Sequence, residues 1–260
     1  MFAILCRDAA TTPRNRLPLP RMPEPHHGPL PQLDFDGDYG RSYRQSIRDA
    51  VPGYDSLIEI AAAALLQVVP GAGSILVVGP GWGEELLPVL QALPQARLTL
   101  LEPSLQMAEG CRALLDQADQ SHRCELHVQA LEPDRLPDAA PFDAVLCHNV
   151  LHLLPAERQR ALLRALASCV APGGALVLSA LSEPADDSTL EALLPVAISR
   201  LRLRGVDEGV IAKLLASRNT LVFSLDQQTL EHELCAAGLT PPLLLQQVLL
   251  SRLWLSCRPG

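Results

Sequence analysis

The stretch ILVVGPGWGEE, residues 75–85, decides the fold. Its four aliphatic residues predict a short buried strand, and its glycines at positions 79, 81 and 83 predict a tight turn. The two glutamates that follow begin a helical run. Glycines in such a turn let the backbone reverse direction and let a nucleotide approach closely, because no Cβ stands in the way. The stretch therefore predicts a nucleoside-binding turn at the carboxyl end of the first strand.

Aliphatic strand-like runs alternate with helical runs beyond this turn. The next four are RLTLLE, CELHVQAL, FDAVLCHN and GALVLSA. Short strands separated by helices imply right-handed crossovers and a parallel sheet covered on both faces. Two last runs, LLLQQVLL and RLWLSC, are close enough in sequence to form an antiparallel hairpin. The predicted fold class is α/β, with a Rossmann-like seven-stranded sheet that is mostly parallel, ends in a C-terminal antiparallel hairpin and has helices on both faces.

The chain divides into a tail and one domain. Residues 1–33 contain seven prolines, which is typical of an extended or disordered tail, and Met22 offers an alternative start. Residues 34–260 are predicted to form a single domain. Two helical segments of this domain, 39–69 and 182–220, lie outside the alternation of strands and helices and are predicted to form a lid.

All three tyrosines lie in the first lid segment, at Tyr39, Tyr43 and Tyr54. One interpretation is ordinary packing onto the body of the domain. The other is an aromatic lid that places ring faces over a cationic ligand. The sequence pattern leaves both interpretations open.

The composition excludes several classes of protein. With 48% hydrophobic and 19% charged residues, the chain can bury a large core and is not wholly disordered. The net charge of −8 argues against a nucleic-acid partner, and no apolar run reaches the roughly 18 residues of a membrane span. The seven cysteines are scattered without a Cys-x-x-Cys pair, which argues against a metal site and is typical of a reduced, cytoplasmic protein. The oligomeric state is left open, and a homodimer is allowed.

Acidic residues around the turn identify the kind of nucleoside. Glu102 ends the second predicted strand about twenty residues after the turn, where a carboxylate accepts hydrogen bonds from both ribose hydroxyls. Glu84 and Glu85 stand where the pyrophosphate of a dinucleotide would need the positive end of a helix, and they repel a phosphate. S-adenosylmethionine (SAM), which is cationic and has no phosphate, is therefore the predicted ligand.

The stretches ILVVGPGWG, LLEPS, FDAVLCHNVLHLLP and ERQRALLRALASCVAPGGALVLS together resemble the class I SAM-dependent methyltransferase superfamily, from about residue 40 to residue 258. Within it, SIRDAVPGYDSLIE and VIAKLLASRNTLVFSLDQQTLEHELCAAGL are similar to carboxy-SAM synthase. For the SAM site this resemblance implies the residues Tyr54, Gly79, Pro80, Gly81, Glu102, Pro103 and Asn149. We add Tyr43 and Gly83 to this set.

Three positions depart from the pattern of the superfamily. Val77 stands two residues before the first turn glycine, where the superfamily usually has an acid, so the carboxylate partner of the methionyl amine is missing. Leu131 stands where an aspartate usually holds the adenine amino group, with Glu132 as the neighbouring substitute. Leu215 aligns with the arginine that in carboxy-SAM synthase would hold the added carboxylate.

Valine in place of an acid at position 77 favours the neutral form of the methionyl amine of SAM. A facing carboxylate would stabilise the ammonium, whereas an apolar wall and the neighbouring sulfonium both lower the pKa of the amine from its reference value of about 8. A neutral amine held near the γ-carbon of its own substrate can displace 5'-methylthioadenosine and close an azetidine ring. In this respect the sequence resembles the methyltransferase-fold enzymes that cyclise SAM to azetidine-2-carboxylate for peptide natural products. Cyclisation of SAM is therefore the preferred interpretation.

This hypothesis gives the candidate residues their roles. Glu102 holds the ribose, Asn149 accepts a hydrogen bond from the attacking amine, and Tyr54, with Tyr43, places a ring face near the sulfonium. The histidines of CHNVLHLL are the nearest groups to take the released proton, with His148 preferred, although a histidine pair at this strand end is also ordinary packing. Tyr54, Asn149 and His148 are therefore the predicted catalytic residues.

Three other interpretations remain open. Conventional methyl transfer to a small molecule needs an acceptor cavity, which the two lid segments can form. A non-catalytic SAM-binding module is allowed by the altered acidic positions. Carboxy-SAM synthesis needs another cation to hold the added carboxylate, because this chain has Leu215 where carboxy-SAM synthase has an arginine. The expected partners are SAM and, for methyl transfer, a small-molecule acceptor.

Overall fold

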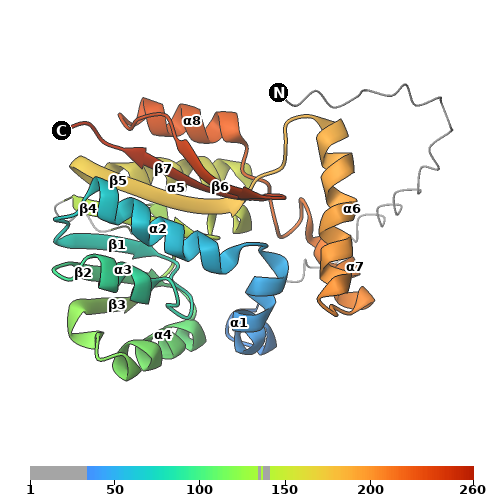
Figure 1. The fold of residues 1–260 in the computed structure, drawn as a ribbon, viewed down its shortest axis with the longest axis horizontal. Coiled ribbons are helices and arrows are strands. Elements are labelled where there is room, and N and C mark those ends of the chain that lie inside the picture. Colours follow the sequence, from blue (N-terminus) through green and yellow to red (C-terminus); the bar gives the residue numbers. More distant parts are fainter. Residues whose placement is uncertain (1–33, 134–135, 137–140) are drawn as a thin grey trace, which may run out of the picture.

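One sheet of seven strands organises the part of the chain that the computed structural model describes, residues 34–133, 136 and 141–260 (Figure 1). The strand order is β3-β2-β1-β4-β5-β7-β6, so the predicted α/β fold class is confirmed. The predicted tail, residues 1–33, lies outside the described residues. The strands are β1 (Ser74–Val78), β2 (Arg97–Glu102), β3 (Cys124–Val128), β4 (Phe142–His148), β5 (Val170–Leu181), β6 (Leu243–Val248) and β7 (Ser251–Cys257).

The sheet is parallel except at one edge. The strands β3, β2, β1, β4 and β5 pair in parallel, whereas β7 is antiparallel to both β5 and β6. The pairing of Val248 with Ser251 closes the predicted C-terminal hairpin. The chain builds outward from β1 in both directions, because β2 lies on one side of it and β4 on the other. Ligands of open α/β sheets bind at the carboxyl ends of the strands beside such a switch point.

Helices cover both faces of the sheet. The helices α2, α3 and α4 share one apolar cluster with Ile75 and Val77, and α5 and α8 share a second cluster with Leu76 and Val78. The four residues Ile75 to Val78 of β1 are fully buried, which explains why this part of the strand is continuously apolar. The helices are α1 (Asp38–Ala50), α2 (Tyr54–Val68), α3 (Leu86–Ala92), α4 (Leu105–Gln117), α5 (Ala156–Ser168), α6 (Asp187–Leu203), α7 (Glu208–Ser217) and α8 (Gln227–Ala236), with short 3-10 helices η1 (Ser121–Arg123) and η3 (Leu151–Leu153).

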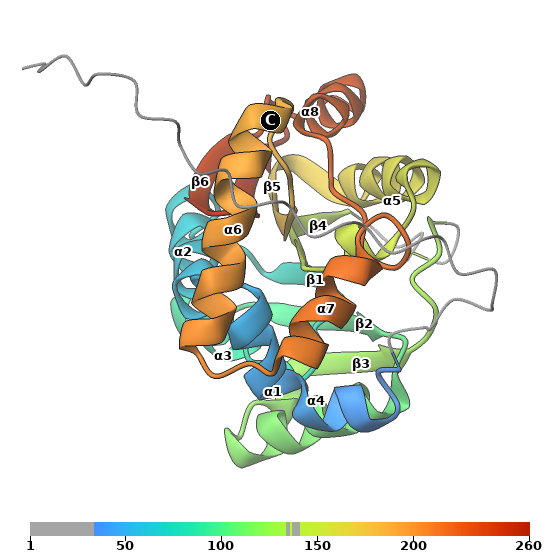
Figure 2. The same ribbon diagram turned by 90° about the vertical axis from the view of Figure 1, so that its right-hand side faces the viewer.

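The remaining helices, α1, α6 and α7, lie beyond one end of the strands (Figure 2). Arg200 of α6 donates a hydrogen bond to the backbone carbonyl of Arg48 at 2.9 Å, near the end of α1, and a second to the carbonyl of Asp49. In α6 and α7 together, Ile211 is the one buried residue. The predicted lid segment 39–69 is divided in the structure, because α2 buries six residues against α3 and the sheet.

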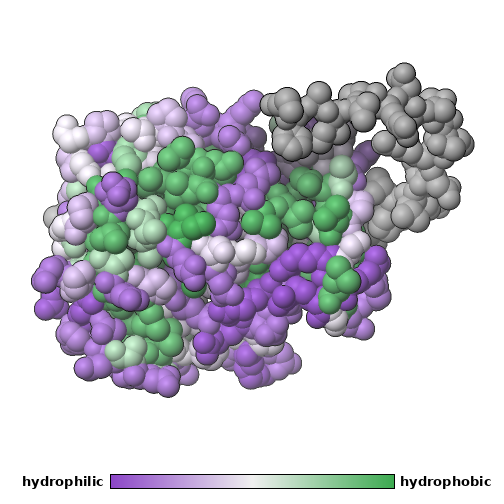
Figure 3. Space-filling view, viewed as in Figure 1, coloured by the Kyte–Doolittle hydropathy of each residue, from purple (hydrophilic) through white to green (hydrophobic). Residues whose placement is uncertain are grey.

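Apolar side chains are also exposed on the face that carries α2 and β6. They include Leu66, Leu243 and Leu244, and Figure 3 shows hydrophobic areas over this face. In the described ranges, none of the helices combines the length and the apolar character that crossing a membrane requires. The homodimer that the sequence analysis allows stays untested.

Candidate functional site

The glycine turn between β1 and α3 requires glycine for steric reasons. Gly79 has a φ of 73°, and a Cβ there would lie 2.4 Å from Cγ2 of Val150. Gly83 has a φ of 79°, and a Cβ there would lie 2.7 Å from Sγ of Cys111. Side chains other than glycine rarely adopt this left-handed conformation. The predicted turn is thus packed tightly from both sides, with its backbone at the carboxyl end of β1.

The carboxylate of Glu102 is held at the end of β2 by two backbone groups. Its Oε2 accepts a hydrogen bond from the N–H of Gly81 at 2.9 Å, and its Oε1 accepts one from the N–H of Ser104 at 3.0 Å. Burial raises the pKa of Glu102, and the two N–H groups oppose this rise. The carboxylate is therefore oriented beside the glycine turn, as a ribose-binding acid must be.

A cavity of about 90 Å³ opens at the carboxyl ends of β1, β2 and β4. Most of the predicted site residues line it, namely Tyr43, Gly79, Gly81, Glu102, Pro103, Leu131, His148 and Asn149. Tyr39 and His152, which the sequence analysis considered as a lid tyrosine and as a proton acceptor, line it as well. The lining residues that were not predicted from the sequence are Phe35, Ile47, Met107, Val150 and Leu153.

Tyr54 does not line this cavity. The side chain is buried, and the guanidinium of Arg48 lies 5.3 Å from the centre of its ring. One face of the ring therefore already has a cationic partner from the protein. Burial raises the pKa of the Tyr54 hydroxyl, so the residue is a neutral phenol at ordinary pH.

Three further predicted residues also lie outside the cavity lining. Pro80 and Gly83 are buried within the glycine turn. The carboxylate of Glu132 forms an ion pair with Arg158 at 2.6 Å. Leu131 lines the cavity while Glu132 is turned toward α5, so the cavity wall is apolar at this position.

An aromatic cluster closes the cavity. The rings of Phe35, Tyr39 and Tyr43 lie 5.3 to 6.0 Å apart, and all three line the cavity. Tyr39 and Tyr43 are four residues apart on one face of α1, and Phe35 lies in the turn before this helix. The helical spacing of the two tyrosines is the sequence signal that could have added Tyr39 to the site. Ligand pockets typically measure roughly 300–1,000 Å³. A ligand as large as SAM therefore requires this aromatic cluster to move outward.

Asn149 follows β4 directly in an uncommon backbone conformation. Its φ is 58°, and its N–H donates a hydrogen bond to the carbonyl of Ser179 at 2.9 Å. Asparagine adopts the left-handed region more readily than most residues. The conformation turns the chain sharply, and the buried side chain lines the cavity. Strained residues of this kind concentrate at functional sites.

The two histidines at this edge are neutral, His148 being buried and His152 half-buried. Nδ1 of His148 lies 3.2 Å from Oγ of Ser179, whereas its Nε2 has no hydrogen-bond partner among the described residues. Nδ1 of His152 accepts a hydrogen bond from the N–H of Leu181 at 3.3 Å. Burial lowers the pKa of each histidine to about 4. Both are therefore poor proton acceptors at neutral pH, although His148 can still form a hydrogen bond.

The two glutamates after the glycine turn have different environments. Glu84 forms ion pairs with Arg44 at 2.8 Å and with Arg48 at 2.9 Å, which ties α1 to the turn. Glu85 is buried, and its Oε1 has no hydrogen-bond partner among the described residues. Burial and the charges of Glu102 and Glu84 raise the pKa of Glu85 well above its ordinary value. From the sequence, Glu84 and Glu85 served only to argue against a nucleotide with phosphates, and neither was predicted as a site residue.

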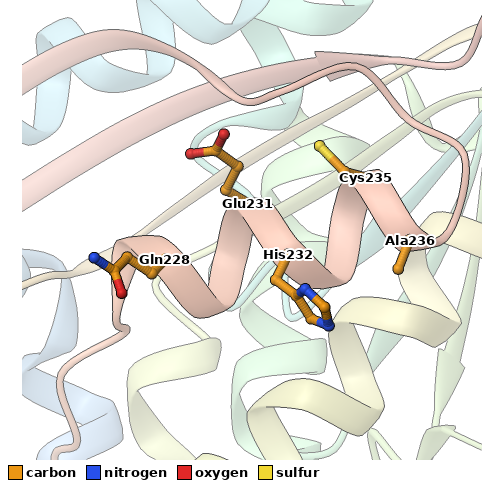
Figure 4. A pocket seen from close by; sticks show the side chains of 5 residues that line it. All are labelled: Gln228, Glu231, His232, Cys235 and Ala236. Carbon is orange, nitrogen blue, oxygen red and sulfur yellow. The ribbon is translucent and has the colours of Figure 1, made fainter.

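A second hollow lies along α8, away from this cavity (Figure 4). Glu231 and Cys235 project to one side of the helix and His232 to the other. Across the described ranges, no three His, Cys, Asp or Glu side chains are grouped so that they could hold a metal ion. The hollow is lined by Gln228, Glu231, His232, Cys235 and Ala236.

Comparison with known proteins agrees with the geometry. Residues 76–176 match the family described as "Methyltransferase domain". Carboxy-S-adenosyl-L-methionine synthases from Pseudomonas putida and Pseudomonas fluorescens are 28% and 27% identical to the chain over 221 and 216 residues. Each alignment covers 80% of this chain and 86% of the relative.

Two solved structures of magnesium protoporphyrin IX methyltransferase from Synechocystis have the same fold. The one with bound S-adenosylhomocysteine (SAH) is 17% identical with a TM-score of 0.63, covering 87% of this chain and 97% of that chain. The one with bound SAM is 16% identical with a TM-score of 0.61, covering 86% and 93%.

The sheet order and the glycine turn are similar to those of the class I SAM-dependent methyltransferase superfamily, and these comparisons agree with that similarity. They support an enzyme related to the SAM-dependent methyltransferases, with the methyltransferase fold. Within the superfamily, its sequence is similar to the carboxy-SAM synthases at below 30% identity.

Proposed function

We propose that the protein cyclises SAM to azetidine-2-carboxylate and releases 5'-methylthioadenosine. The observation that carries this proposal is Val77, which is fully buried near the carboxyl end of β1 in an apolar cluster with Leu86 and Val89. An apolar wall at this position lowers the pKa of the methionyl amine, because it offers the ammonium no ion-pair partner.

The proposed reaction needs no second substrate. The lone pair of the neutral amine forms a bond to the γ-carbon, and the bond between the γ-carbon and sulfur breaks. Its electron pair neutralises the sulfonium, so methylthioadenosine leaves as a neutral molecule. The ring nitrogen takes the positive charge, and the proton lost from the ammonium before the attack passes to a base. The product is a non-proteinogenic amino acid, which suits natural-product biosynthesis.

The site residues supply binding and orientation in this proposal. Glu102 holds the ribose, and the backbone of the glycine turn follows the methionyl arm. Asn149 accepts a hydrogen bond from the amine and directs its lone pair toward the γ-carbon. Tyr43 faces the sulfonium with its ring, while Tyr54 positions Arg48 and through it α1. His148 forms a hydrogen bond as a neutral side chain, because its pKa is too low for it to hold the proton at neutral pH.

The aromatic cover of the cavity supports a reaction on SAM alone. The aromatic cluster, which consists of Phe35, Tyr39 and Tyr43, closes over the ends of β1, β2 and β4. After the cluster has moved outward to admit SAM, its return over the ligand would exclude water and hold the flexible arm folded. We also propose that residues 34–260 act as one SAM-binding domain, with α1 and the segment 182–220 as its lid.

Methyl transfer to a small molecule is the second candidate. The observation that favours it is the loose packing of α6 and α7, of which Ile211 alone is buried. These helices can move and admit an acceptor. Carboxy-SAM synthesis has less support, because Arg218 is engaged by Glu183 at 2.9 Å and Lys213 is exposed.

Incubation of the purified protein with SAM alone tests the proposal. We expect methylthioadenosine to form faster than in samples that contain no enzyme or a Glu102→Gln variant. SAM that is bound but stays intact would contradict cyclisation. Formation of SAH after small-molecule extracts are added would then support methyl transfer.

A further inference from the structure

His148 is a buried residue of the cavity wall that uses one of its two ring nitrogens. Its exposure is 3%, and its Nδ1 lies 3.2 Å from Oγ of Ser179 on the neighbouring strand β5. Its Nε2 is buried and has no hydrogen-bond partner among the described residues. Buried polar atoms without a partner are uncommon. A ligand group in the cavity would supply the missing partner of Nε2.

The hydroxyl group of Ser179 determines which nitrogen of His148 carries the proton. Ser179 is fully buried, and within the described ranges its Oγ forms a hydrogen bond with Nδ1 of His148 alone. The hydroxyl hydrogen therefore points to Nδ1, because a buried hydroxyl that donates to nothing is costly. Burial lowers the pKa of His148 to about 4, so the ring is neutral at pH 7. A neutral imidazole that accepts at Nδ1 carries its hydrogen on Nε2, which makes Nε2–H a donor.

His148 lies on the same face of the sheet as Val77. Val77 pairs with Leu146 in the adjacent strand β4, and both side chains belong to one apolar cluster. Side chains along a strand alternate between the two faces, so His148, two residues beyond Leu146, shares their face. The proposed function places the methionyl amine beside Val77. In that binding mode His148 lies beside the amino-acid arm of SAM.

The carboxylate of this arm has no positively charged partner in the cavity wall. None of the described residues that line the cavity is lysine or arginine. A neutral N–H or O–H group is therefore the kind of donor that this wall offers to a carboxylate. The amine of the arm is not the partner of Nε2–H in the proposed reaction, because its lone pair must stay free to attack the γ-carbon. The acceptor left on the arm is the carboxylate.

His152 lines the same cavity and carries its hydrogen on the same ring atom. Its Nδ1 accepts a hydrogen bond from the backbone N–H of Leu181 at 3.3 Å, so the neutral ring is protonated at Nε2. His152 belongs to η3, beyond the end of β4, whereas His148 is the last residue of that strand. A test of His148 must therefore include a variant of His152.

We propose that Nε2–H of His148 holds the α-carboxylate of SAM, and that Ser179 is the positioning residue that keeps this hydrogen on Nε2. The proposal rests on the proposed function and names the group that holds one end of the amino-acid arm. Asn149 accepts a hydrogen bond from the amine, and its own N–H donates to the carbonyl of Ser179 at 2.9 Å. Ser179 thus anchors both residues. An arm held at its carboxylate and its amine rotates less, so the amine stays near the γ-carbon.

The first test determines the tautomer of His148 in the full chain. Long-range proton–nitrogen correlation spectra of protein labelled with nitrogen-15 in its histidines distinguish protonated from unprotonated ring nitrogens, and the spectrum of His148→Phe identifies the signals of His148. We expect the proton on Nε2 in the wild type at pH 7 and a mixture of both tautomers in Ser179→Ala. The control is Ser182→Ala, because Ser182 is also fully buried but its Oγ has no partner among the described residues. It should leave the spectrum of His148 unchanged.

The second test compares two ligands that differ in the carboxylate alone. SAH and its decarboxylated analogue share the nucleoside, the sulfur and the amine, and calorimetry measures the affinity of each. His148→Phe should bind SAH about ten- to hundredfold more weakly, as expected for a lost hydrogen bond to a charged group, and should bind the analogue as the wild type does. His148→Gln, which offers an amide N–H, should recover part of the SAH affinity. Ser182→Ala should match the wild type with both ligands.

A proton on Nδ1 in the wild type would overturn the proposal, and an unchanged tautomer in Ser179→Ala would overturn the role of Ser179. Equal weakening of both ligands in His148→Phe would indicate a structural role only and would also overturn it. So would a loss of SAH affinity in His152→Phe but not in His148→Phe. Thermal unfolding shows whether each variant folds.

The wild type provides a test that needs no variant. Equal affinity of the wild type for SAH and its decarboxylated analogue would overturn the carboxylate contact. A wild-type protein that binds SAH but forms no methylthioadenosine from SAM would instead overturn cyclisation. The two affinities would then still decide whether His148 holds the carboxylate.

Discussion

Glu102 and Gly81 are joined by a hydrogen bond of 2.9 Å from the backbone N–H of the glycine to the carboxylate. The bond connects the end of β2 to the glycine turn that follows β1. Since the N–H of Ser104 holds the other carboxylate oxygen, the orientation of Glu102 is set by the backbone rather than by a ligand. In the proposed binding mode, a ribose that binds Glu102 would therefore be held in a fixed position relative to the glycine turn.

Glu102→Gln should weaken SAM binding by about tenfold or more, since hydrogen bonds to a charged group contribute about 1.5–3 kcal/mol. Titration calorimetry measures this affinity directly. Glu109→Gln on the exposed side of α4 is the control and should bind as the wild type does. Equal affinity of the two variants would remove Glu102 from the site.

The affinity for SAM should depend on pH through the same carboxylate. The pKa of Glu102 is raised, mainly by burial, so its ionised form prevails only above that raised value. We expect the affinity to be constant at high pH and to fall as the pH decreases through the raised pKa, because the protonated acid accepts fewer hydrogen bonds from the ribose and does not attract the cation. Calorimetry from pH 8 to pH 5 should show this fall in the wild type. Glu102→Gln should lack it, and an equal fall in both proteins would assign the effect to another group.

Val77→Asp should suppress formation of methylthioadenosine from SAM. A facing carboxylate raises the pKa of the amine by about 1–3 units, so the neutral fraction at pH 7 falls at least about tenfold. Val77→Asn is the control, since it has nearly the same shape without the charge. Binding of SAM to both variants is measured first, to show that the buried site tolerates the substitution. Turnover that is the same in the two variants would contradict the argument from Val77.

Tyr43→Leu should raise the KM for SAM about 2- to 30-fold. The variant removes an aromatic face, and a cation–π contact contributes about 0.5–2 kcal/mol. Tyr43→Phe keeps the ring and should behave as the wild type, because the hydroxyl has no part in this contact. A KM that rises as much in Tyr43→Phe as in Tyr43→Leu would show that the ring face is not what SAM binds.

The sequence predicted the sheet well because each buried strand is a short aliphatic run. In β1 the run Ile75 to Val78 is apolar on both faces, and its end at Gly79 fixes where the turn begins. The same logic located Glu102 and Asn149, since Glu102 is the last residue of β2 and Asn149 directly follows β4. Residues at strand ends can thus be assigned to a site from the sequence.

Other site residues depend on how separate helices meet, which the sequence does not encode locally. Phe35, in the turn before α1, and Tyr39, in α1, reach the cavity only through the way this segment lies against the strand ends. Tyr54 was predicted to face the ligand, yet Arg48 covers one side of its ring.

The central claim is that the amine of SAM closes a ring on its own γ-carbon. The most direct measurement uses SAM labelled with carbon-13 in its methionyl carbons and follows all labelled products over time. The account predicts one azetidine-2-carboxylate for each methylthioadenosine released. Labelled homoserine or its lactone in place of the azetidine, or labelled SAM that stays intact, would contradict it.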